Sequence, residues 1–581
     1  MKKLILVFLM ILGSNLAQGQ VSRLDNLDPH KSAKASQAFR TQQFKKAAQL
    51  YYEVASANPE RGFYWYRAAM SYIRLKDIKK AHECFKKCVK TSGHSFMVNP
   101  MLGLARTYAM LNQPKEAIAT LKKLFGYDVN SMGMVYQLPE FQTEAYQKNP
   151  AFLTLFGGKF PGKQSRMAGW RFDLSLLAQK MEEVHYNLFA EVDKTVWRNA
   201  VKALEQKIPQ LKDYEIIAEL MKLVALDRST YLYPLTNGQA MHRLPINIYW
   251  FDDGIFIRAA TSENKALVGA KILKIGDQPI EKLQEVARKY ITYENEMSWK
   301  ARTPRFLQTP ELLMIEKATN SLEKVKMTVE IKGKTKVVTI KALTFAELVQ
   351  KYGTEISKTP NFDERTPIKS WVSMQDPGRT PLYLEHPYEN YRSKYFPEQN
   401  VFYTQFNFSG SKKGESIIKF CNGMTKKVNE KSAKAWIIDL RFLHKGSVYS
   451  NRAIMEALVK ASTNLRGKIF GIIGRETYHV GQHLAQDMEY RCPMVWAGEA
   501  TGGRPNFAYD NNILTLPYSG IKVNIPHNYV QGGPSRNRDK RQYLGTYLGV
   551  GLTSQDYKEG FDPALEAILK YIKTDPRSGK K

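Results

Sequence analysis

The 581-residue sequence is poor in cysteine and in acidic residues, and it contains only one long uninterrupted apolar stretch. Four cysteines exclude a disulfide-rich scaffold. After the first dozen residues, no segment approaches the roughly 20 apolar residues of a membrane-spanning helix. A hydrophobic content of 43% still fits globular domains, and a chain of this length is expected to form several of them.

The single apolar stretch lies at the beginning of the chain and is typical of an export signal. Lys2 and Lys3 precede an apolar run at residues 4–12, and Ala17 and Gly19 supply the small residues of a cleavage site before Gln20. No cysteine follows the run, so a lipid anchor is not expected. The sequence therefore predicts a signal peptide at residues 1–19 and a mature protein in the periplasm or outside the cell.

The shortage of acidic residues gives the chain a net charge of +31. Cleavage of the signal leaves +29, because the first 19 residues hold two lysines and no acid. We favour the interpretation that this charge is a well-solvated surface. Attraction to anionic glycans or lipid head groups is the alternative. Nucleic acid is not an expected partner, because the chain is predicted to be exported and carries no recognition motif.

The four cysteines are not expected to hold a metal or a cofactor. Cys84 and Cys88 lie four residues apart on a predicted helix, near His82, and this spacing matches no standard zinc pattern, so buried packing is predicted. Cys421 and Cys492 could form a disulfide only if the fold brings them together. The sequence leaves that pairing open.

Residues 28–156 show a helical repeat. Apolar and small residues recur at intervals of 34 and then 36 residues: Ala47, Ala81 and Ala117, with Phe44 matched by Ile78. This pattern resembles tetratricopeptide repeats, in which each helix–turn–helix unit buries its apolar face by stacking on the next. The resemblance implies a protein or peptide partner in a concave face. A packing domain without a ligand is the alternative.

A linker is predicted at residues 157–169, which are rich in glycine and lysine and lack periodicity. A small helical domain is predicted at 170–235. Its first helix is amphipathic and begins at Trp170, and two more helices are predicted at 195–207 and 213–226.

An α/β domain is predicted at residues 365–575. Strands are predicted at 401–408 and 434–440, with an amphipathic helix between them. The clearest pattern is the apolar run Ile469–Ile473, typical of a strand buried on both faces, followed by Gly474 and by a helix that begins at His479. Free N–H groups at such a strand-to-helix corner can hold an oxyanion, and serine hydrolases place their nucleophile there.

Several motifs, in the right order from about Trp170 to Tyr571, resemble those of tail-specific, or C-terminal-processing, serine peptidases, including the tricorn-like branch. The resemblance implies a ClpP/crotonase-like α/β peptidase domain after the helical domain. The matching positions are Asp227 and Thr230, Trp436–Arg441, Gly474, Arg475, Thr477, Tyr478, Gly498–Asn506, Leu516–Gly520, Thr553, Asp556, Tyr557, Gly560, Asp562 and Pro563.

The same resemblance implies a PDZ-like β domain at residues 245–345. Strand patterns at 255–257 and 270–275 are followed by the turn signal Gly276-Asp277 and by a helix from Pro279. Domains of this type accept the end of a peptide along a strand edge. A rigid spacer is the alternative interpretation.

The catalytic positions implied by the resemblance are substituted. His479 occupies the position of the serine nucleophile, and Ser229 occupies that of the histidine base. Residues 442–447 replace a glycine-rich oxyanion loop, and bulky side chains there are expected to crowd the hole. The remaining candidates for oxyanion or peptide binding are Gly446, Val480, Glu499, Gly502 and Gly503.

Acyl transfer needs a nucleophile, a base and an oxyanion hole in register, and all three are altered here. We therefore predict an exported pseudopeptidase that binds peptide or protein tails. If the fold is kept, Ser229 and His479 should face each other within about 2.6–3.2 Å or through one water.

Three alternatives remain open. The first is an active serine-type endopeptidase with a rearranged site that uses Ser229 or a nearby hydroxyl (Thr477, Tyr478, Ser447, Ser450 or Ser519). The second is a metal site at His479 and His483, with His444 near them. Val480 replaces the glutamate of a zinc-protease motif, so we favour a structural histidine pair. The third is a purely structural interaction protein that acts through its repeats.

Overall fold

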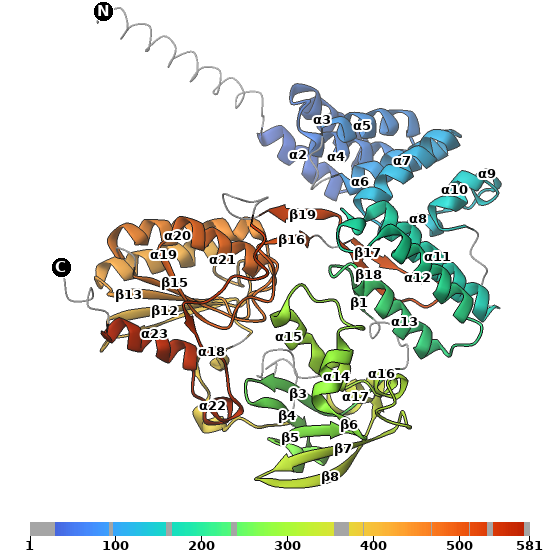
Figure 1. The fold of residues 1–581 in the computed structure, drawn as a ribbon. Helices are drawn as coiled ribbons and strands as arrows, with labels where there is room; N and C mark the ends of the chain where they lie inside the picture. The colour runs from blue at the N-terminus through green and yellow to red at the C-terminus, as the bar shows by residue number, and fades with distance from the viewer. Residues whose placement is uncertain are drawn as a thin grey trace, which may run out of the picture. The chain divides into compact units, whose positions relative to one another are not determined.

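The computed structural model describes residues 29–91, 97–158, 165–233, 241–353, 371–386, 388–465, 468–509, 512–531 and 539–574 (Figure 1). The chain divides into two compact units. The first unit holds Met1–Gln179 and Asn512–Tyr518, and the second holds Lys180–Asn511 and Ser519–Lys581. The predicted signal peptide at residues 1–19 lies outside the described residues. Within the described ranges, no helix has the length and apolarity needed to cross a membrane.

The first unit contains the predicted helical repeats. Small residues such as Ala47, Ala81 and Ala117 are completely buried, so neighbouring helices approach closely. Cys84 and Cys88 are buried on α5 and form no disulfide, which confirms the packing role predicted for them. The helices are α2 (Pro29–Arg40), α3 (Phe44–Ala57), α4 (Gly62–Arg74), α5 (Ile78–Thr91), α6 (Val98–Met110), α7 (Pro114–Tyr127), α8 (Ser131–Gln137), α9 (Glu144–Gln147) and α10 (Pro150–Leu155).

The predicted linker at 157–169 is too long at its C-terminal end, and residues 159–164 lie outside the described ranges. Helix α11 (Arg166–Val184) begins four residues before the predicted start at Trp170. Gly169 is a helical residue, and a Cβ atom there would lie 2.2 Å from the ring of Tyr518. This glycine therefore permits close packing of an aromatic ring and does not mark a linker.

The second unit begins at Lys180, near the end of α11, and continues with the helices α12 (Lys194–Lys207) and α13 (Asp213–Ala225), as predicted. A β domain follows, whose sheet has the order β10-β4-β5-β7-β8, with β3 paired to β4 and β6 to β5. Its strands are β3 (Ile246–Phe251), β4 (Gly254–Thr261), β5 (Lys271–Ile275), β6 (Gln278–Pro279), β7 (Lys324–Ile331), β8 (Lys334–Lys341) and β10 (Trp371–Ser373), and its helices are α14 (Ile280–Ala287), α15 (Glu296–Leu307), α16 (Pro310–Ile315) and α17 (Phe345–Tyr352).

Strand β10 corrects the predicted domain boundary. Residues 371–373 were assigned to the α/β domain at 365–575, but Trp371 lies opposite Thr261 of β4 in the β domain. The buried Trp371 side chain packs in a small cluster with Leu348 and Tyr352 of α17. A strand of three residues carries no periodic signal, so only the tertiary packing identifies it.

The α/β domain is built on a six-stranded sheet of order β11-β12-β13-β14-β15-β20. The edge strand β11 is antiparallel, and every other neighbouring pair is parallel. Strands β12, β13 and β14 are buried along their whole length, which explains their continuous apolar runs. The strands are β11 (Tyr391–Phe396), β12 (Val401–Phe406), β13 (Ala435–Asp439), β14 (Ile469–Ile473), β15 (Met494–Gly498) and β20 (Leu548–Gly549).

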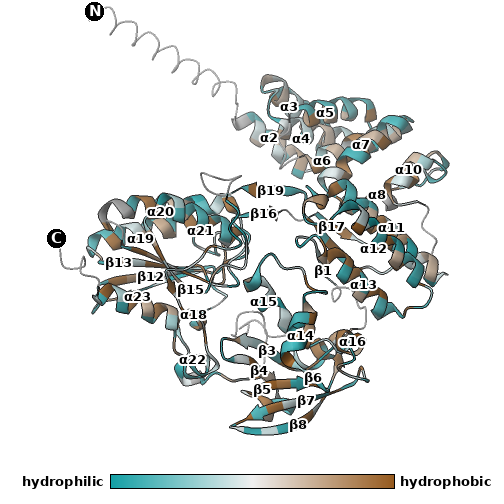
Figure 2. Ribbon diagram, in the orientation of Figure 1, coloured by the Kyte–Doolittle hydropathy of each residue, from teal (hydrophilic) through white to brown (hydrophobic). Residues whose placement is uncertain are grey.

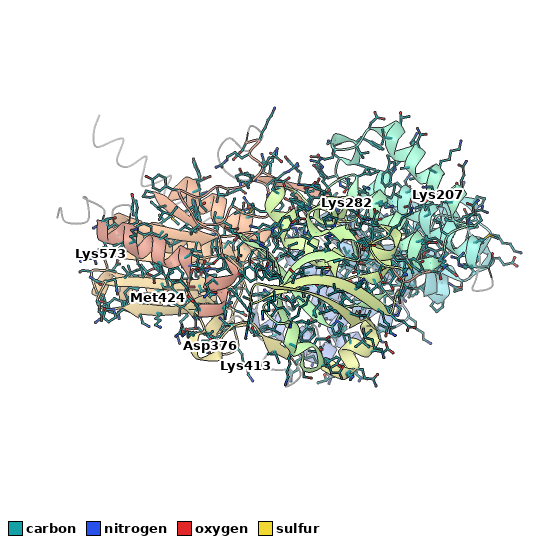
Figure 3. The ribbon with its side chains drawn as sticks, turned by 60° about the horizontal axis from the view of Figure 1, so that its bottom comes forward. Lys207, Lys282, Asp376, Lys413, Met424 and Lys573 are labelled. Carbon is teal, nitrogen blue, oxygen red and sulfur yellow. The ribbon has the colours of Figure 1, made fainter. Side chains whose placement is uncertain are left out.

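Helices cover both faces of this sheet. One face packs against α19 (Ile417–Glu430), α20 (Val448–Leu465) and α21 (Val480–Arg491), and the other against α18 (Leu382–Glu385) and α23 (Pro563–Thr574). Figure 2 shows hydrophobic residues on the strands between these layers. The side chains are drawn in Figure 3, where Met424 marks α19 and Lys573 marks α23. Cys421 and Cys492 are both buried and unbonded, so no disulfide joins them.

Candidate functional site

The predicted strand-to-helix corner is present at the C-terminal end of β14. Thr477 fixes the turn, because its hydroxyl donates to the carbonyl of Leu440 (2.8 Å) and accepts the N–H of Gly474 (3.1 Å). His479 is the residue before α21 and has φ 48° and ψ −114°. Glycine adopts this conformation readily in type II′ turns, whereas other residues are strained there. The corner therefore stores backbone strain at the position of the predicted nucleophile replacement.

We predict that glycine and alanine differ in stability at position 479. Both His479→Gly and His479→Ala remove the imidazole, but only glycine adopts the positive φ without strain. The His479→Gly variant should therefore be more stable than His479→Ala by about 1–2 kcal/mol. Urea unfolding measures the difference. His483, one turn further along α21, provides the matched control. Because this position is helical, the His483→Ala variant should be more stable than His483→Gly by about 1 kcal/mol. If alanine were more stable than glycine at both positions, the corner would not be strained.

Aromatic rings surround the half-buried imidazole of His479. The ring of Phe507 stacks on it at a centroid distance of 6.1 Å and an interplanar angle of 15°. The rings of Tyr478 (4.9 Å) and Tyr231 (6.3 Å) lie edge-on to it. The position where an acyl-transfer enzyme would present a hydroxyl thus presents an imidazole packed among aromatic side chains.

The Asp227–Thr230 motif forms a tight turn after α13. The Oδ1 atom of Asp227 accepts the backbone N–H groups of Ser229 and Thr230, each at 2.8 Å. Arg228 has a φ of 59°, in the left-handed region that glycine adopts most freely. The family resemblance implies a glycine at this position, so the backbone of the turn agrees with the sequence alignment although the side chain differs.

Among the described residues, Ser229 forms no direct hydrogen bond with His479, and a contact between them through one water stays a prediction. The hydroxyl of Ser229 lies 2.9 Å from Nε2 of His185, and the same nitrogen lies 3.2 Å from Oδ2 of Asp227. Tyr231, two residues after Ser229, is the residue of this segment whose ring lies beside His479. Because β1 (Tyr231–Tyr233) pairs antiparallel with β18 (Lys522–Ile525), the segment beyond the turn is fixed in the sheet.

The hydrogen bond at Nδ1 of His185 shows which of its two ring nitrogens carries the proton. The backbone N–H of Asn187 points to Nδ1 of His185 at 3.1 Å, so Nδ1 acts as an acceptor and is unprotonated. Nε2 then carries the proton, and both Ser229 Oγ and Asp227 Oδ2 face this N–H. A nitrogen that donates toward Ser229 cannot remove the proton of its hydroxyl, so the arrangement resembles a catalytic triad in its residues but not in its chemistry.

The loop that holds Gly446 is tied to Val480, the first residue of α21. Asn451 donates to the carbonyl of Val480 (3.1 Å) and accepts the hydroxyl of Ser409 (2.7 Å), while the carbonyl of Ser409 accepts the N–H of Ser447 (2.8 Å), next to Gly446. Within the described residues, the N–H groups of Val480 and Gly446 have no acceptor. The two predicted oxyanion donors thus retain free N–H groups, and the crowding expected from residues 442–447 stays a prediction.

The other three candidates have structural contacts, although the N–H of Gly503, like those of Val480 and Gly446, has no acceptor within the described residues. The N–H of Gly502 donates to the carbonyl of Thr477 (3.1 Å), and a Cβ atom there would lie 2.1 Å from the carbonyl oxygen of Arg475. At Gly503 a Cβ atom would lie 3.3 Å from the side chain of Gln482. Glu499 pairs with Arg475, whose Nε lies 2.8 Å from Oε2. Gly502 and the Glu499–Arg475 pair thus brace the corner.

We predict a pH dependence from the Glu499–Arg475 pair. Burial alone raises the pKa of Glu499, but the positive charges of Arg475 and Lys300 outweigh burial, and the pKa lies below its ordinary value of 4.5. The pair therefore contributes stability above pH 4.5 that is lost as the pH falls through the depressed pKa. Urea unfolding should show wild type more stable than Glu499→Gln at pH 7, with a gap that narrows below pH 4.5. A gap independent of pH would contradict this origin.

The histidines near the corner have partners other than a metal. The ring of His444 stacks on Tyr478 at 4.9 Å, and Nδ1 of His483 lies 3.4 Å from Oδ2 of Asp487. Throughout the described residues, no group of three or more His, Cys, Asp or Glu side chains is arranged to hold a metal ion.

Comparison with known proteins gives one family match and several structural neighbours. A tetratricopeptide repeat model matches residues 64–93, and no curated protein matches the sequence. Mature CPAF complexed with lactacystin is 10% identical over 70% of this chain and 98% of its own, with a TM-score of 0.49. The photosystem II D1 C-terminal processing protease is 10% identical over 70% of this chain and 98% of its own, with a TM-score of 0.34. A putative peptidase from Parabacteroides merdae is 11% identical over 72% of this chain and 100% of its own, with a TM-score of 0.35. The structural neighbours are CPAF and C-terminal-processing peptidases.

Proposed function

We propose that this protein is a peptidase-like binding protein that holds extended peptide or protein tails without cleaving them. One observation carries the proposal: at the strained corner before α21, the side chain that would attack a scissile carbonyl is the imidazole of His479. An imidazole in this position carries no hydroxyl or thiol for acyl transfer, and the potential base, His185, donates its Nε2 proton toward Ser229 and Asp227.

Features that serve binding are present although the catalytic side chains are replaced. The N–H groups of Val480 and Gly446 have no acceptor within the described residues and remain available to a peptide carbonyl. The half-buried imidazole of His479 and the half-buried ring of Tyr231 beside it offer apolar contact area, backed by the buried ring of Phe507. A corner with free N–H donors and an imidazole in place of the nucleophile is suited to holding a chain, not to hydrolysing it.

A binding assay tests the proposal. Fluorescence anisotropy with labelled, unstructured peptides should show saturable binding, and mass spectrometry should recover the peptides intact. A His479→Ala variant should bind more weakly, whereas a Tyr547→Ala substitution on the same unit should bind like wild type, since Tyr547 is 75% exposed and lies away from the corner in the sequence. If no peptide binds to the wild-type protein, the proposal fails and the alternative of a structural interaction protein that acts through its repeats replaces it.

A second candidate, serine-type hydrolysis at Ser229, is favoured by the distance of 2.9 Å between its hydroxyl and His185 Nε2. We expect it to fail, because the proton on Nε2 prevents activation of the hydroxyl. An active-site fluorophosphonate probe should leave Ser229 unlabelled in wild type, as in Ser229→Ala. Labelling that maps to Ser229 and depends on His185 would establish the hydrolase instead.

The proposal includes export, because the chain begins with a charged, then apolar segment and a small-residue cleavage site. The partners proposed are peptide or protein tails on the second unit and a protein partner on the repeats. A fractionation of the native host should find the mature protein, beginning at Gln20, in the envelope or the medium.

A further inference from the structure

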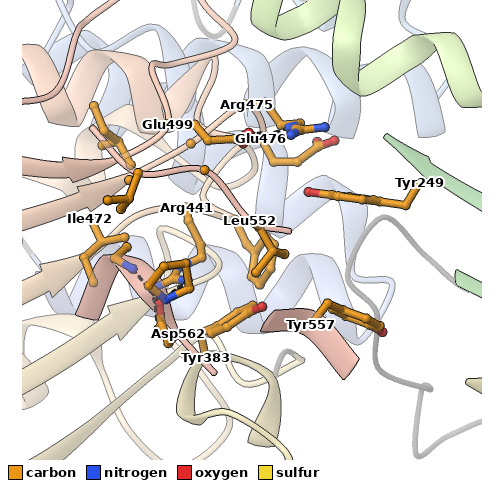
Figure 4. A pocket seen from close by; sticks show the side chains of 18 of the residues that line it. Tyr249, Tyr383, Arg441, Ile472, Arg475, Glu476, Glu499, Leu552, Tyr557 and Asp562 are labelled. Atoms are coloured by element: carbon orange, nitrogen blue, oxygen red, sulfur yellow. Dashed lines mark hydrogen bonds and ion pairs between the residues drawn. The ribbon is translucent and has the colours of Figure 1, made fainter. Parts of the chain in front are cut away.

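A cavity of about 80 Å³ lies at the carboxyl ends of β13, β14 and β15, beside the hairpin of β3 and β4 (Figure 4). Ligands of α/β folds commonly bind outside the carboxyl ends of the parallel strands. The residues that line the cavity include Gly474, Arg475 and Glu476, which lead into the corner at His479. The cavity therefore shares its wall with the proposed peptide site.

The lining of the cavity holds equal numbers of arginines and carboxylates (Arg258, Arg441, Arg475, Glu476, Glu499 and Asp562), and two of the arginines form ion pairs in the wall. Arg441 forms a two-pronged pair with Asp562 (3.1 and 2.8 Å), and Arg475 forms one with Glu499. Figure 4 shows both pairs at the edge of the space, with their charged groups directed at each other. Because the charges are balanced in the wall, the cavity offers little net attraction for an ion and suits a neutral group.

Aromatic side chains form much of the remaining wall, and one of them carries an unused polar atom. The lining includes Tyr249, Tyr383, Phe442 and Tyr557. Tyr383 is only 3% exposed, and its hydroxyl has no hydrogen-bond partner among the described residues. Figure 4 shows the hydroxyls of Tyr249 and Tyr383 directed toward the interior of the cavity. A buried hydroxyl without a partner is rare, and it marks a position where a polar group of a ligand can bind.

The size of the space limits the ligand to a single ring. An apolar protein cavity of about 150 Å³ holds benzene. The present cavity of about 80 Å³ is smaller but open to solvent on one side, so one edge of a ring can remain in the mouth. Flat walls, balanced charge and one spare hydroxyl match a phenol better than an aliphatic chain or a carboxylate.

We propose that this cavity receives one aromatic side chain, that of a tyrosine, from the peptide bound at the neighbouring corner. The hydroxyl of Tyr383 bonds to the phenol of the ligand, and the rings of Tyr249 and Tyr557 enclose it. The inference rests on the proposed function, because it assigns a side-chain preference to the peptide-binding protein.

The side-chain analogue p-cresol tests the cavity without a peptide. Titration of the full mature protein, followed by ligand-observed NMR, should show saturable binding of p-cresol and weaker binding of toluene and acetate. Tyr383→Phe should lower the affinity for p-cresol about five- to tenfold, because one hydrogen bond is lost. The variant should then bind p-cresol no more tightly than toluene. Leu552→Trp should abolish binding by filling the space. The matched Tyr547→Phe, at a residue that is 75% exposed, should bind like wild type.

Competition with peptide separates the two proposals. A short unstructured peptide with one tyrosine should displace p-cresol, and the same peptide with alanine in that place should bind more weakly and leave p-cresol bound. If p-cresol does not bind to wild type, or binds equally well to Leu552→Trp, the cavity assignment is overturned. Equal binding of acetate would also overturn it. A peptide that binds without displacing p-cresol overturns this inference and leaves the proposed function standing, whereas failure of every peptide to bind overturns both.

Discussion

Casein and unstructured peptides incubated with the mature protein should be cleaved no faster than in a parallel incubation with His479→Ala. Removal of the nucleophile alone costs a serine peptidase about 10⁶-fold in kcat. Here His479 occupies the position of the nucleophile. The expected rate therefore lies below detection for every substrate.

The reverse substitution should not create an enzyme. In His479→Ser a hydroxyl would stand at the strained corner, but the ring that lies beside this position in the segment after Asp227 is that of Tyr231. The imidazole of His185 faces Ser229 and Asp227 instead, and its free lone pair accepts the N–H of Asn187. A serine without a base loses most of the rate enhancement of a serine peptidase, about 10⁴- to 10⁶-fold.

Release of peptide fragments can be followed by mass spectrometry over a day, with Ser229→Ala as the second control. Turnover by wild type that disappears in His479→Ala would contradict the proposal of an inactive site. Turnover that survives in His479→Ala but disappears in Ser229→Ala would establish the rearranged serine site.

The fold of this chain was largely predictable because its elements repeat or are buried on both faces. The run Ile469–Ile473 gives β14 with its correct bounds, since a central parallel strand needs apolar residues at every position. The 34-residue interval between Ala47 and Ala81 likewise indicates stacked helices, and both residues are completely buried. Such signals are local or periodic, so they can be recognised in the sequence without knowledge of the tertiary contacts.

The arrangement of the site was predictable only at the corner. His479 was identified because a strand, a turn and a helix follow each other in sequence. His185 was missed, because it ends a helix 42 residues before Asp227 and carries no local pattern that sets it apart from a packed histidine. Its role depends on two contacts, with Ser229 and Asn187, that only the folded chain creates. The direction of the Ser229 hydroxyl was missed for the same reason.

The largest loss of stability is expected on removal of Arg441. This guanidinium lies between Asp439, at 2.9 Å from its Nε, and Asp562, which it binds with both terminal nitrogens at 3.1 and 2.8 Å. Asp439 also accepts the hydroxyl of the buried Tyr403 (2.6 Å). Burial alone lowers the pKa of Arg441, but the two carboxylates outweigh burial and hold the pKa well above its ordinary value, so the side chain is charged in the fold.

Arg441→Ala should therefore lower the free energy of unfolding by about 3–5 kcal/mol, because it leaves two carboxylates buried without a cation. Urea unfolding measures the loss. Arg452→Ala is the matched control: Arg452 pairs with Glu456 on α20 with its side chain 85% exposed, and its loss should change little, by at most about 0.5 kcal/mol. Arg441→Lys should fall between the two, since lysine keeps the charge but cannot bind Asp562 with two parallel N–H groups. A loss in Arg441→Ala no larger than that of the control would show that the carboxylates are already satisfied by water, and that the cavity wall beside them is wetter than the balanced charges imply.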